Sequence, residues 1–316
     1  MAGKRVTSTS EAALMVNIGR RHFLNGQSKN DIADVLGISR FRVARLLERA
    51  LEERIVRIEV GLLGQVDAGL GHELEEQLDL ERVIVVDTAA QEDELVLRRR
   101  IGTAALELLG ETMTKDDVVG LASARPLLGV GDRVEAFPAC TVVQLTGAVS
   151  RPDALDIIQS IRDVTRVGGG QARVFYAPIV GPTPSEVLRQ QPDVARAFAL
   201  FPRLTAAVVG VGSWAPGLST IYDTVGELQR REAHQAGVRH EIAGIYLDQH
   251  GEPVEAPLRT HTLGIDHEAL RVVPQRIGLA FGLGKAESIR AGAEGKIFNS
   301  LITHRALAES VLSQPL

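Results

Sequence analysis

Four arginines lie close together near the N-terminus, in an order that suits contact with DNA. Arg42, Arg45 and Arg49 follow one another at helical spacing and form one cationic stripe, with Arg40 beside them in the first turn. A guanidinium can form two hydrogen bonds to the edge of a guanine and can also pair with phosphates. The stripe is therefore a candidate DNA-reading surface; the alternative is the solvated face of a helical module that docks a protein.

Three short helices are predicted to position this stripe. Apolar residues recur at helical spacing over 11–25, and the helix that carries the arginines is expected from Arg40 to about residue 53. Between them, Ser28 is a suitable N-cap for a second helix that ends at Gly37, and Ser39 caps the third. The caps and the apolar spacing together predict a helical head.

Three residues of this head have the spacing of a helix-turn-helix. Ala33 places a small side chain where two helices touch, Gly37 allows the sharp turn, and Val43 seats the recognition helix. The head is therefore predicted to bind double-stranded operator DNA. The residues predicted to hold or contact the DNA are Ser28, Lys29, Ser39, Arg40, Arg42, Val43 and Arg45.

Charge is distributed unevenly along the chain. Residues 1–60 carry 11 lysines and arginines against 7 acids, a net charge of +4, whereas the whole chain carries −5. A basic head on an acidic body favours nucleic-acid contact at one end only. Behind the arginine helix, Ile55, Ile58 and Val60 alternate as in a short strand.

The rest of the chain alternates between compact apolar runs and helical stretches. This alternation predicts an α/β fold with a doubly wound, mostly parallel, Rossmann-like sheet, whose ligand crevice lies beyond the carboxyl ends of the strands. The expected strands are 82–86, 118–121, 141–145, 206–211, 242–247 and 276–280, and the expected helices are 95–109, 154–164, 185–199, 225–236 and 286–294.

We expect three segments along the chain: a helix-turn-helix domain over 1–60, a linker helix over 61–80 and an effector domain over 81–316. Leu70, Leu74 and Leu78 recur every fourth residue in the linker helix. Core packing and a dimer seam explain this spacing equally well.

Small and polar residues follow several of the expected strands. They are Ser123-Ala124-Arg125, Thr146-Gly147, Gly212-Ser213 and the run from Gly282 to Lys285 before the last expected helix, 286–294. Backbone amides freed by glycine, a helix N-terminus and one lysine together suit a phosphate or a polyhydroxylated ligand. Because the ends of parallel strands meet at one edge, these residues are predicted to converge on one effector site.

Several other readings fail. Gly210 to Ala215 imitates a dinucleotide fingerprint, but Pro216 and Gly217 follow, so no helix opens there. The eight histidines and the single cysteine show no metal-ligand spacing, and we expect no cofactor and no metal. The uncharged stretch 204–222 contains glycine and proline and is expected to form a buried strand and a loop rather than a membrane span. The lone Cys140 and the absence of a leader sequence favour the cytoplasm.

Short motifs in order along the chain resemble the SorC family of bacterial sugar-responsive transcription regulators. They lie at 38–47, 50–60, 208–213, 237–244, 282–289 and 301–303. The resemblance implies a repressor or activator that forms dimers or tetramers, binds palindromic operators and responds to a sugar phosphate through a sensor built like sugar-phosphate isomerases.

The resemblance also implies roles for single residues. Lys285 would face the phosphate of the ligand, Thr146-Gly147 would contribute amides, and Glu241 occupies the position of an aspartate that contacts ligand hydroxyls. One loop departs from the family pattern: the family has Trp-Gly-x-Thr where this chain has 123–126, Ser-Ala-Arg-Pro. Arg125 can replace the lost donors with a charge-assisted contact, which leaves open whether the effector is a sugar phosphate, a sugar or a polyol.

The sequence therefore predicts a DNA-binding regulator of a carbohydrate-catabolism operon rather than an enzyme. The alternative is a sugar-phosphate isomerase or deaminase with an appended head, in which Glu241 or Asp248, with His240 adjoining, would transfer protons. A protein-docking adaptor is a third reading. Because a head of charge +4 binds DNA weakly alone, we expect a homodimer or homotetramer.

Overall fold

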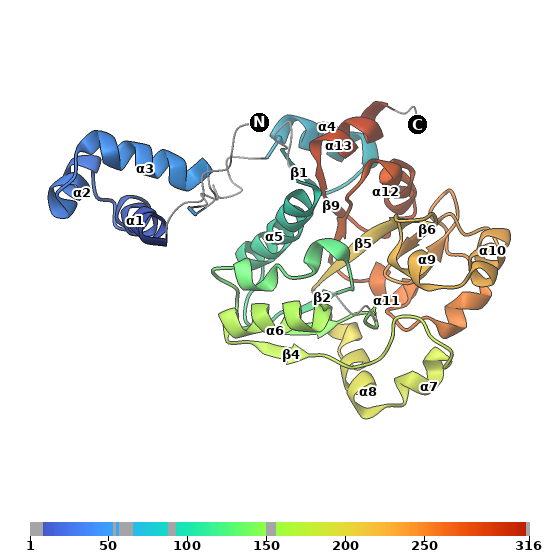
Figure 1. Ribbon diagram of the computed structural model, residues 1–316. Coiled ribbons are helices and arrows are strands. Elements are labelled where there is room, and N and C mark those ends of the chain that lie inside the picture. The colour runs from blue at the N-terminus through green and yellow to red at the C-terminus, as the bar shows by residue number, and fades with distance from the viewer. Residues whose placement is uncertain (1–8, 53–54, 57–65, 88–92, 150–155, 314–316) are drawn as a thin grey trace. The chain divides into compact units, whose positions relative to one another are not determined.

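The computed structural model describes residues 9–52, 55–56, 66–87, 93–149 and 156–313. The chain divides into two compact units, Met1–Gly61 and Leu62–Leu316, and each is described by itself (Figure 1). The proposed segment boundaries at residues 60 and 80 stay predictions. Part of the short strand expected over 55–60 lies outside the described residues.

The first unit contains three helices and one π-helical turn in its described part. They are α1 (Thr9–Gly19), η1 (Arg20–Leu24, the π-helical turn), α2 (Lys29–Leu36) and α3 (Arg40–Glu52). A small core of Met15, Ile18, Ile32 and Val43, all fully buried, holds them together. At about 25 cal/mol per Å² of buried apolar surface, a core of this kind holds a short helix that would not be stable alone.

The helix ends of this unit confirm the predicted capping chemistry. The Ser28 hydroxyl accepts a hydrogen bond from the Asp31 amide at 3.2 Å, and the Asp31 carboxylate accepts one from the Ser28 amide at 3.1 Å. Gly37 ends α2 with φ +62°, a left-handed conformation in which a Cβ would be strained. The Ser39 hydroxyl accepts a hydrogen bond from the Arg42 amide at 3.2 Å and so begins α3.

The second unit is built on a sheet whose main path has seven parallel strands in the order β1-β9-β8-β5-β2-β3-β4. This architecture confirms the expected doubly wound α/β fold. In sheet order the strands are β1 (Arg82–Val86), β9 (Ser300–His304), β8 (Gln275–Leu279), β5 (Ala206–Ser213), β2 (Val118–Leu121), β3 (Thr141–Gln144) and β4 (Gln171–Arg173).

Helices cover both faces of this sheet (Figure 1). On one face, α5 (Glu94–Thr112) and α6 (Ile157–Gly168) pack on side chains such as Val119 and Leu121. On the other face, α4 (Ala68–Leu78), α12 (Ala286–Glu294) and α13 (Arg305–Ser313) pack on the alternate side chains. Leu74 and Leu78 of α4 are buried in this core, so core packing accounts for the four-residue spacing of the leucines.

A single strand was expected over 242–247, but the structure shows a hairpin there. β6 (His240–Ile242) and β7 (Ile245–Leu247) pair antiparallel, and β6 pairs with the end of β5. Ala243 and Gly244 turn the chain with φ values of +53° and +83°, the pattern of a type I′ turn. Alanine seldom adopts such a φ, so the turn carried no sequence signal.

The remaining helices are short. The helix expected over 185–199 is interrupted before Pro192, whose ring cannot continue the preceding turn. The other elements are α7 (Ser185–Arg189), α8 (Pro192–Phe198), α9 (Thr220–Thr224), α10 (Glu227–Gln235), α11 (His267–Arg271), η3 (Arg125–Leu127), η4 (Gly131–Arg133), η5 (Phe201–Arg203), η6 (Pro257–His261) and η7 (Leu283–Lys285).

Candidate functional site

A pocket opens where the strand order of the sheet reverses. From β2 the chain continues outward to β3 and β4, and from β5 it continues in the opposite direction to β8 and β9. Ligands of doubly wound sheets bind in the crevice at such a point, beyond the carboxyl ends of the strands. The pocket, about 460 Å³ counted out to its open mouth, is lined there by residues 123–126 after β2 and 210–212 of β5.

The loop after β2 is held tightly from two sides. The Ser123 amide donates to the Thr146 hydroxyl at 2.8 Å, and the Ala124 amide donates to the Ala122 carbonyl oxygen at 2.8 Å. Gly102 of α5 passes so close to the Pro126 carbonyl oxygen that a Cβ at position 102 would overlap it. Among the described contacts, the Ser123 hydroxyl has no partner, so it is available to a ligand.

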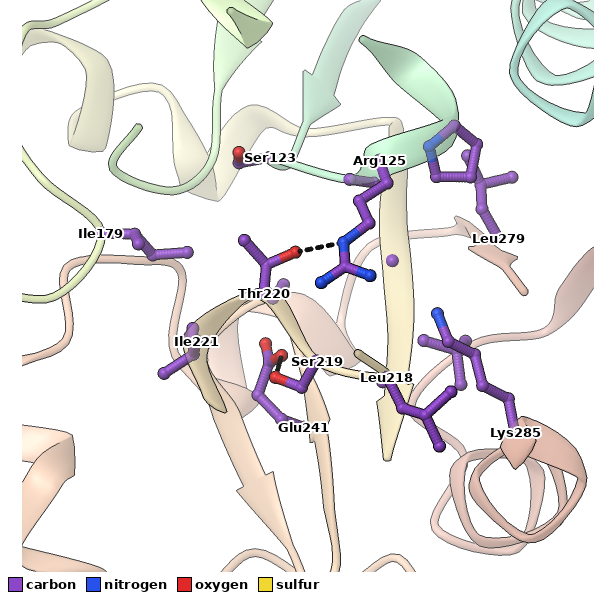
Figure 2. A pocket seen from close by; sticks show the side chains of 16 residues that line it. Ser123, Arg125, Ile179, Leu218, Ser219, Thr220, Ile221, Glu241, Leu279 and Lys285 are labelled. Atoms are coloured by element: carbon purple, nitrogen blue, oxygen red, sulfur yellow. Dashed lines mark hydrogen bonds between the residues drawn. The ribbon is translucent and has the colours of Figure 1, made fainter. Parts of the chain in front are cut away.

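Arg125 begins η3 at the edge of the pocket and is bound to the loop that follows β5. Its Nη2 donates to the Asp223 carboxylate at 2.6 Å and its Nη1 to the Gly217 carbonyl oxygen at 2.5 Å. Its Nε donates to the Thr220 hydroxyl at 3.2 Å (Figure 2). Three of its five N–H groups are thus engaged within the protein. The two others remain available to a ligand oxygen.

Glu241 of β6 presents a buried carboxylate to the pocket. Its Oε2 accepts a hydrogen bond from the Ser219 hydroxyl at 2.9 Å, and its Oε1 accepts one from the Gly244 amide at 2.7 Å. Burial raises the pKa of Glu241, while these two hydrogen bonds and the cations Lys285 and Arg125 oppose the rise. Gly212 permits this packing, because a Cβ there would lie 3.3 Å from Oε2 of Glu241.

Lys285 ends η7 and directs a half-buried amine into the pocket from the side opposite Glu241 (Figure 2). Within the described part of the chain its ammonium has no hydrogen-bond or ion-pair partner. Burial lowers the pKa of Lys285 to about 8, assisted by repulsion from Arg125 and opposed by attraction to Glu241. An unpaired cation in such surroundings is a strong attachment point for an anionic or hydroxylated ligand.

The loop that carries Lys285 is fixed by a chain of buried hydroxyls. The Ser213 hydroxyl donates to the Gly284 carbonyl oxygen at 2.7 Å and lies 2.6 Å from the Ser288 hydroxyl. The Ser288 hydroxyl in turn lies 2.8 Å from Nδ1 of His240. Since Ser213 uses its proton on Gly284, Ser288 donates to Ser213 and the proton of the imidazole resides on Nδ1 of His240.

Six of the nine residues predicted to bind an effector line this pocket, and three do not. The six that line it are Ser123, Ala124, Arg125, Gly212, Glu241 and Lys285. Thr146 accepts from the Ser123 amide, the Gly147 amide donates to the Leu263 carbonyl oxygen at 2.9 Å, and Ser213 holds the Lys285 loop. These three support the lining from behind.

The sequence did not single out the apolar and hydroxyl-bearing part of the lining. It comprises Ile179, Leu218, Ser219, Thr220, Ile221, Ala243 and Leu279, together with Pro126, Gly210 and Val211. One sequence signal could have revealed this part of the lining: Ser219 is a suitable N-cap residue. In the structure it caps α9 and accepts a hydrogen bond from the Tyr222 amide. Apolar walls with a few directed polar groups are usual for small-molecule sites.

Other candidate groups lie away from the pocket. Trp214 is buried against Tyr222 and Tyr246, so it fills the core rather than facing a ligand. The Asp248 carboxylate accepts hydrogen bonds from two amides of its own turn, and burial raises the pKa of the Cys140 thiol to about 11. Across the described ranges, no cluster of His, Cys, Asp and Glu could hold a metal, and no helix is sufficiently long and apolar to span a membrane.

In the first unit, α3 presents a cationic surface. Arg40, Arg42 and Arg45 are exposed, whereas Val43 is fully buried and seats α3 on the core, as its expected role requires. Arg49 differs from the other arginines of the stripe, because its Nη1 donates to the Glu11 carboxylate of α1 at 2.8 Å. Ser28 and Lys29 are exposed at the start of α2.

Comparisons with known proteins give a consistent family. The model described as "Putative sugar-binding domain" matches residues 66–313. The transcriptional regulator YjhU of Escherichia coli K12 is 27% identical to this chain, with 92% of each chain covered. The transcriptional regulator LsrR of Klebsiella pneumoniae is 27% identical, with 99% of each chain covered.

A solved structure agrees in fold. The full-length sorbitol operon regulator SorC of Klebsiella pneumoniae has a TM-score of 0.74 and 20% identity, covering 98% of this chain and 100% of that one. The family match spans most of the chain, and the match to LsrR covers 99% of it. The chain belongs to the SorC family of sugar-binding transcriptional regulators.

Proposed function

We propose that this protein regulates a carbohydrate-catabolism operon by binding operator DNA through its first unit and an effector through the pocket at the β2–β5 switch point. The effector is a sugar phosphate, a sugar or a polyol. The observation that carries the proposal is the convergence of Arg125, Glu241 and Lys285, from three separate elements, on one pocket (Figure 2). Cations and a fixed carboxylate around apolar walls suit a ligand with hydroxyls and a polar or anionic end.

On the DNA side, we assign base contacts to Arg40, Arg42 and Arg45, which are exposed on α3. Lys29 and Ser39 lie at the starts of α2 and α3, where side chains can hold phosphates. Ser28 supports this contact by capping α2, since its amide and its hydroxyl both donate to Asp31. Val43 contributes by seating α3. The weak charge of one head favours a homodimer or homotetramer that engages two half-sites together, and operator binding assigns the protein to the cytoplasm.

We propose binding rather than catalysis in the pocket. Proton transfer between sugar carbons needs a base that is free to accept a proton. The two hydrogen bonds that Glu241 accepts stabilise its charged form and so oppose the uptake of a proton, and His240 is bound to Ser288 behind the pocket. Asp248 belongs to a turn and is not part of the lining. An effector recovered chemically unchanged after prolonged incubation with the protein is the expected result.

A gel-shift titration tests the proposed function. The full chain is titrated onto duplexes from the DNA adjacent to its gene, alone and with single sugar phosphates, free sugars and polyols. We expect a specific shift that one compound alters. Lys285→Ala should keep the shift but lose the response to that compound, whereas Arg42→Ala should lose operator selectivity and still bind the compound. Absence of any shift at low salt would refute DNA binding, and an unchanged response of Lys285→Ala would refute the assigned site.

A further inference from the structure

The recognition helix displays one large apolar side chain to solvent. Phe41 is 85% exposed, the highest value among the eight phenylalanines of the chain. Phenylalanine is usually buried in folded proteins. Phe41 lies in the first turn of α3 (Arg40–Glu52), directly between Arg40 and Arg42.

The face of α3 that carries Phe41 is opposite the face that packs on the core. Val43, Leu46, Leu47 and Ala50 are buried and occupy one side of the helix. At 3.6 residues per turn, position 41 projects from the opposite side, and Arg45 follows one turn later on the same side. Phe41 is thus the apolar centre of a surface whose neighbours Arg40, Arg42 and Arg45 are cationic and exposed.

We propose that Phe41 reads a thymine in the operator by packing against its C5-methyl group in the major groove. The inference rests on the DNA binding proposed above. Side chains in the first turn of a recognition helix reach base edges, and the thymine methyl is the apolar group that those edges present there. The flanking arginines favour an occupant with phosphates over an apolar protein surface, because charge complementarity selects the partner.

A substitution in the DNA tests this contact without disturbing the protein. In the shortest duplex that the full chain shifts, each thymine is replaced in turn by deoxyuridine, which removes only the methyl group. We expect the wild type to lose affinity about fourfold at one thymine of each half-site, the effect of withdrawing one methyl from apolar contact. Phe41→Ala should bind more weakly and show no loss at that same position, whereas Phe41→Leu should retain part of the sensitivity.

Matched controls separate the outcomes. Val16 of α1 is also partly exposed, at 44%, and Val16→Ala should keep the full sensitivity to deoxyuridine. If no thymine matters to the wild type, or if Phe41→Ala remains equally sensitive, the inference is overturned while DNA binding stands. If Phe41→Ala instead loses self-association, a second copy of the chain covers Phe41, and this too overturns the inference. A wild type that binds no duplex overturns both proposals.

Discussion

Arg125 and Asp223, almost one hundred positions apart in the chain, form a 2.6 Å ion pair at the edge of the pocket. The pair joins η3, which follows β2, to α9, which follows β5, and so it closes the switch point of the sheet. Arg125 therefore has a structural partner before any effector arrives. An oxygen of the effector must therefore bind one of the two remaining N–H groups of Arg125 or compete with Asp223 for the guanidinium.

This pair should contribute measurably to stability. With side chains only 25% and 20% exposed, its hydrogen bond is partly shielded from water, and Asp223→Asn should lower the free energy of unfolding by about 1 to 2 kcal/mol. Urea unfolding measures the change. The matched control is the exposed pair Arg231–Glu227, at 62% and 83%, where Glu227→Gln should cost less than about 0.5 kcal/mol. Equal losses in the two variants would mean that the pocket pair does not hold the loops.

Lys285 should make stability depend on pH in the alkaline range. Its folded pKa is lowered to about 8, whereas unfolding restores the ordinary value of 10.5. Between these values the unfolded chain binds more protons than the folded chain, so stability rises with pH across that interval. Below about pH 8 the folded protein holds Lys285 in its charged form, and the desolvation of that charge lowers the free energy of unfolding by its full amount. We therefore expect the wild type to gain stability relative to Lys285→Met as the pH rises from about 8 to about 10.

Urea midpoints at several pH values measure this difference. Lys115 is exposed, so Lys115→Met should run parallel to the wild type throughout. A wild-type curve parallel to that of Lys285→Met would show that the Lys285 amine is solvated in the folded protein. An anionic effector should also bind the wild type more weakly above about pH 8, because the lysine then loses its charge.

Local chemistry predicted most of the fold. The caps at Ser28 and Gly37 and the apolar runs of β1 and β2 act through near neighbours in the sequence, and the structure confirms each of them. The hairpin at Ala243 was missed because its backbone conformation is imposed by packing around the turn rather than favoured by alanine. β9 was missed as a strand because only three apolar or β-branched residues mark it.

The candidate site was harder to predict from the sequence. A polar group at a strand end can bind a ligand, but it can equally form a hydrogen bond to another part of the protein. Thr146 and Gly147 follow β3, as expected, yet the Thr146 hydroxyl binds the Ser123 amide and the Gly147 amide binds the Leu263 carbonyl oxygen. Nothing local reveals these partners, which come from other elements. The pairing of Arg125 with Asp223 is hidden for the same reason.

Two serines near the pocket should respond differently to loss of their hydroxyls. Ser288→Ala removes the central member of the buried chain from His240 to Gly284 and leaves the Nδ1 proton of His240 unpaired. It should lower the free energy of unfolding by about 1 to 3 kcal/mol and weaken effector binding by loosening the Lys285 loop. Ser123→Ala removes a hydroxyl that lines the pocket without a partner in the described structure.

Ser123→Ala should therefore keep its stability within about 0.5 kcal/mol of the wild type while losing affinity for an effector that binds this hydroxyl. Urea unfolding and calorimetric titration of the effector separate the two effects. If Ser288→Ala is as stable as the wild type, the chain of hydroxyls does not fix the loop. If Ser123→Ala changes stability instead of affinity, its hydroxyl has a structural role.

In the head, replacing Lys29 and replacing Arg42 should have different effects on how DNA affinity depends on salt and on DNA sequence. Lys29 lies at the start of α2, where a phosphate contact is expected, so Lys29→Ala should weaken binding to all duplexes alike and reduce the slope of log K against log salt by about 1. Arg42 lies on the exposed face of α3, where a base contact is expected. Arg42→Ala should cost about 1 to 3 kcal/mol on the operator and much less on unrelated DNA.

Fluorescence anisotropy at several salt concentrations, on operator and unrelated duplexes, distinguishes the two roles. Lys115→Ala, an exposed substitution in the second unit, provides the reference for removing one positive charge far along the chain from the head. A purely electrostatic head would make Lys29→Ala and Arg42→Ala indistinguishable, because counterion release depends on charge and not on base sequence. A loss confined to the operator for Arg42→Ala would instead require direct contact with a base edge, since the electrostatic contribution is common to both duplexes.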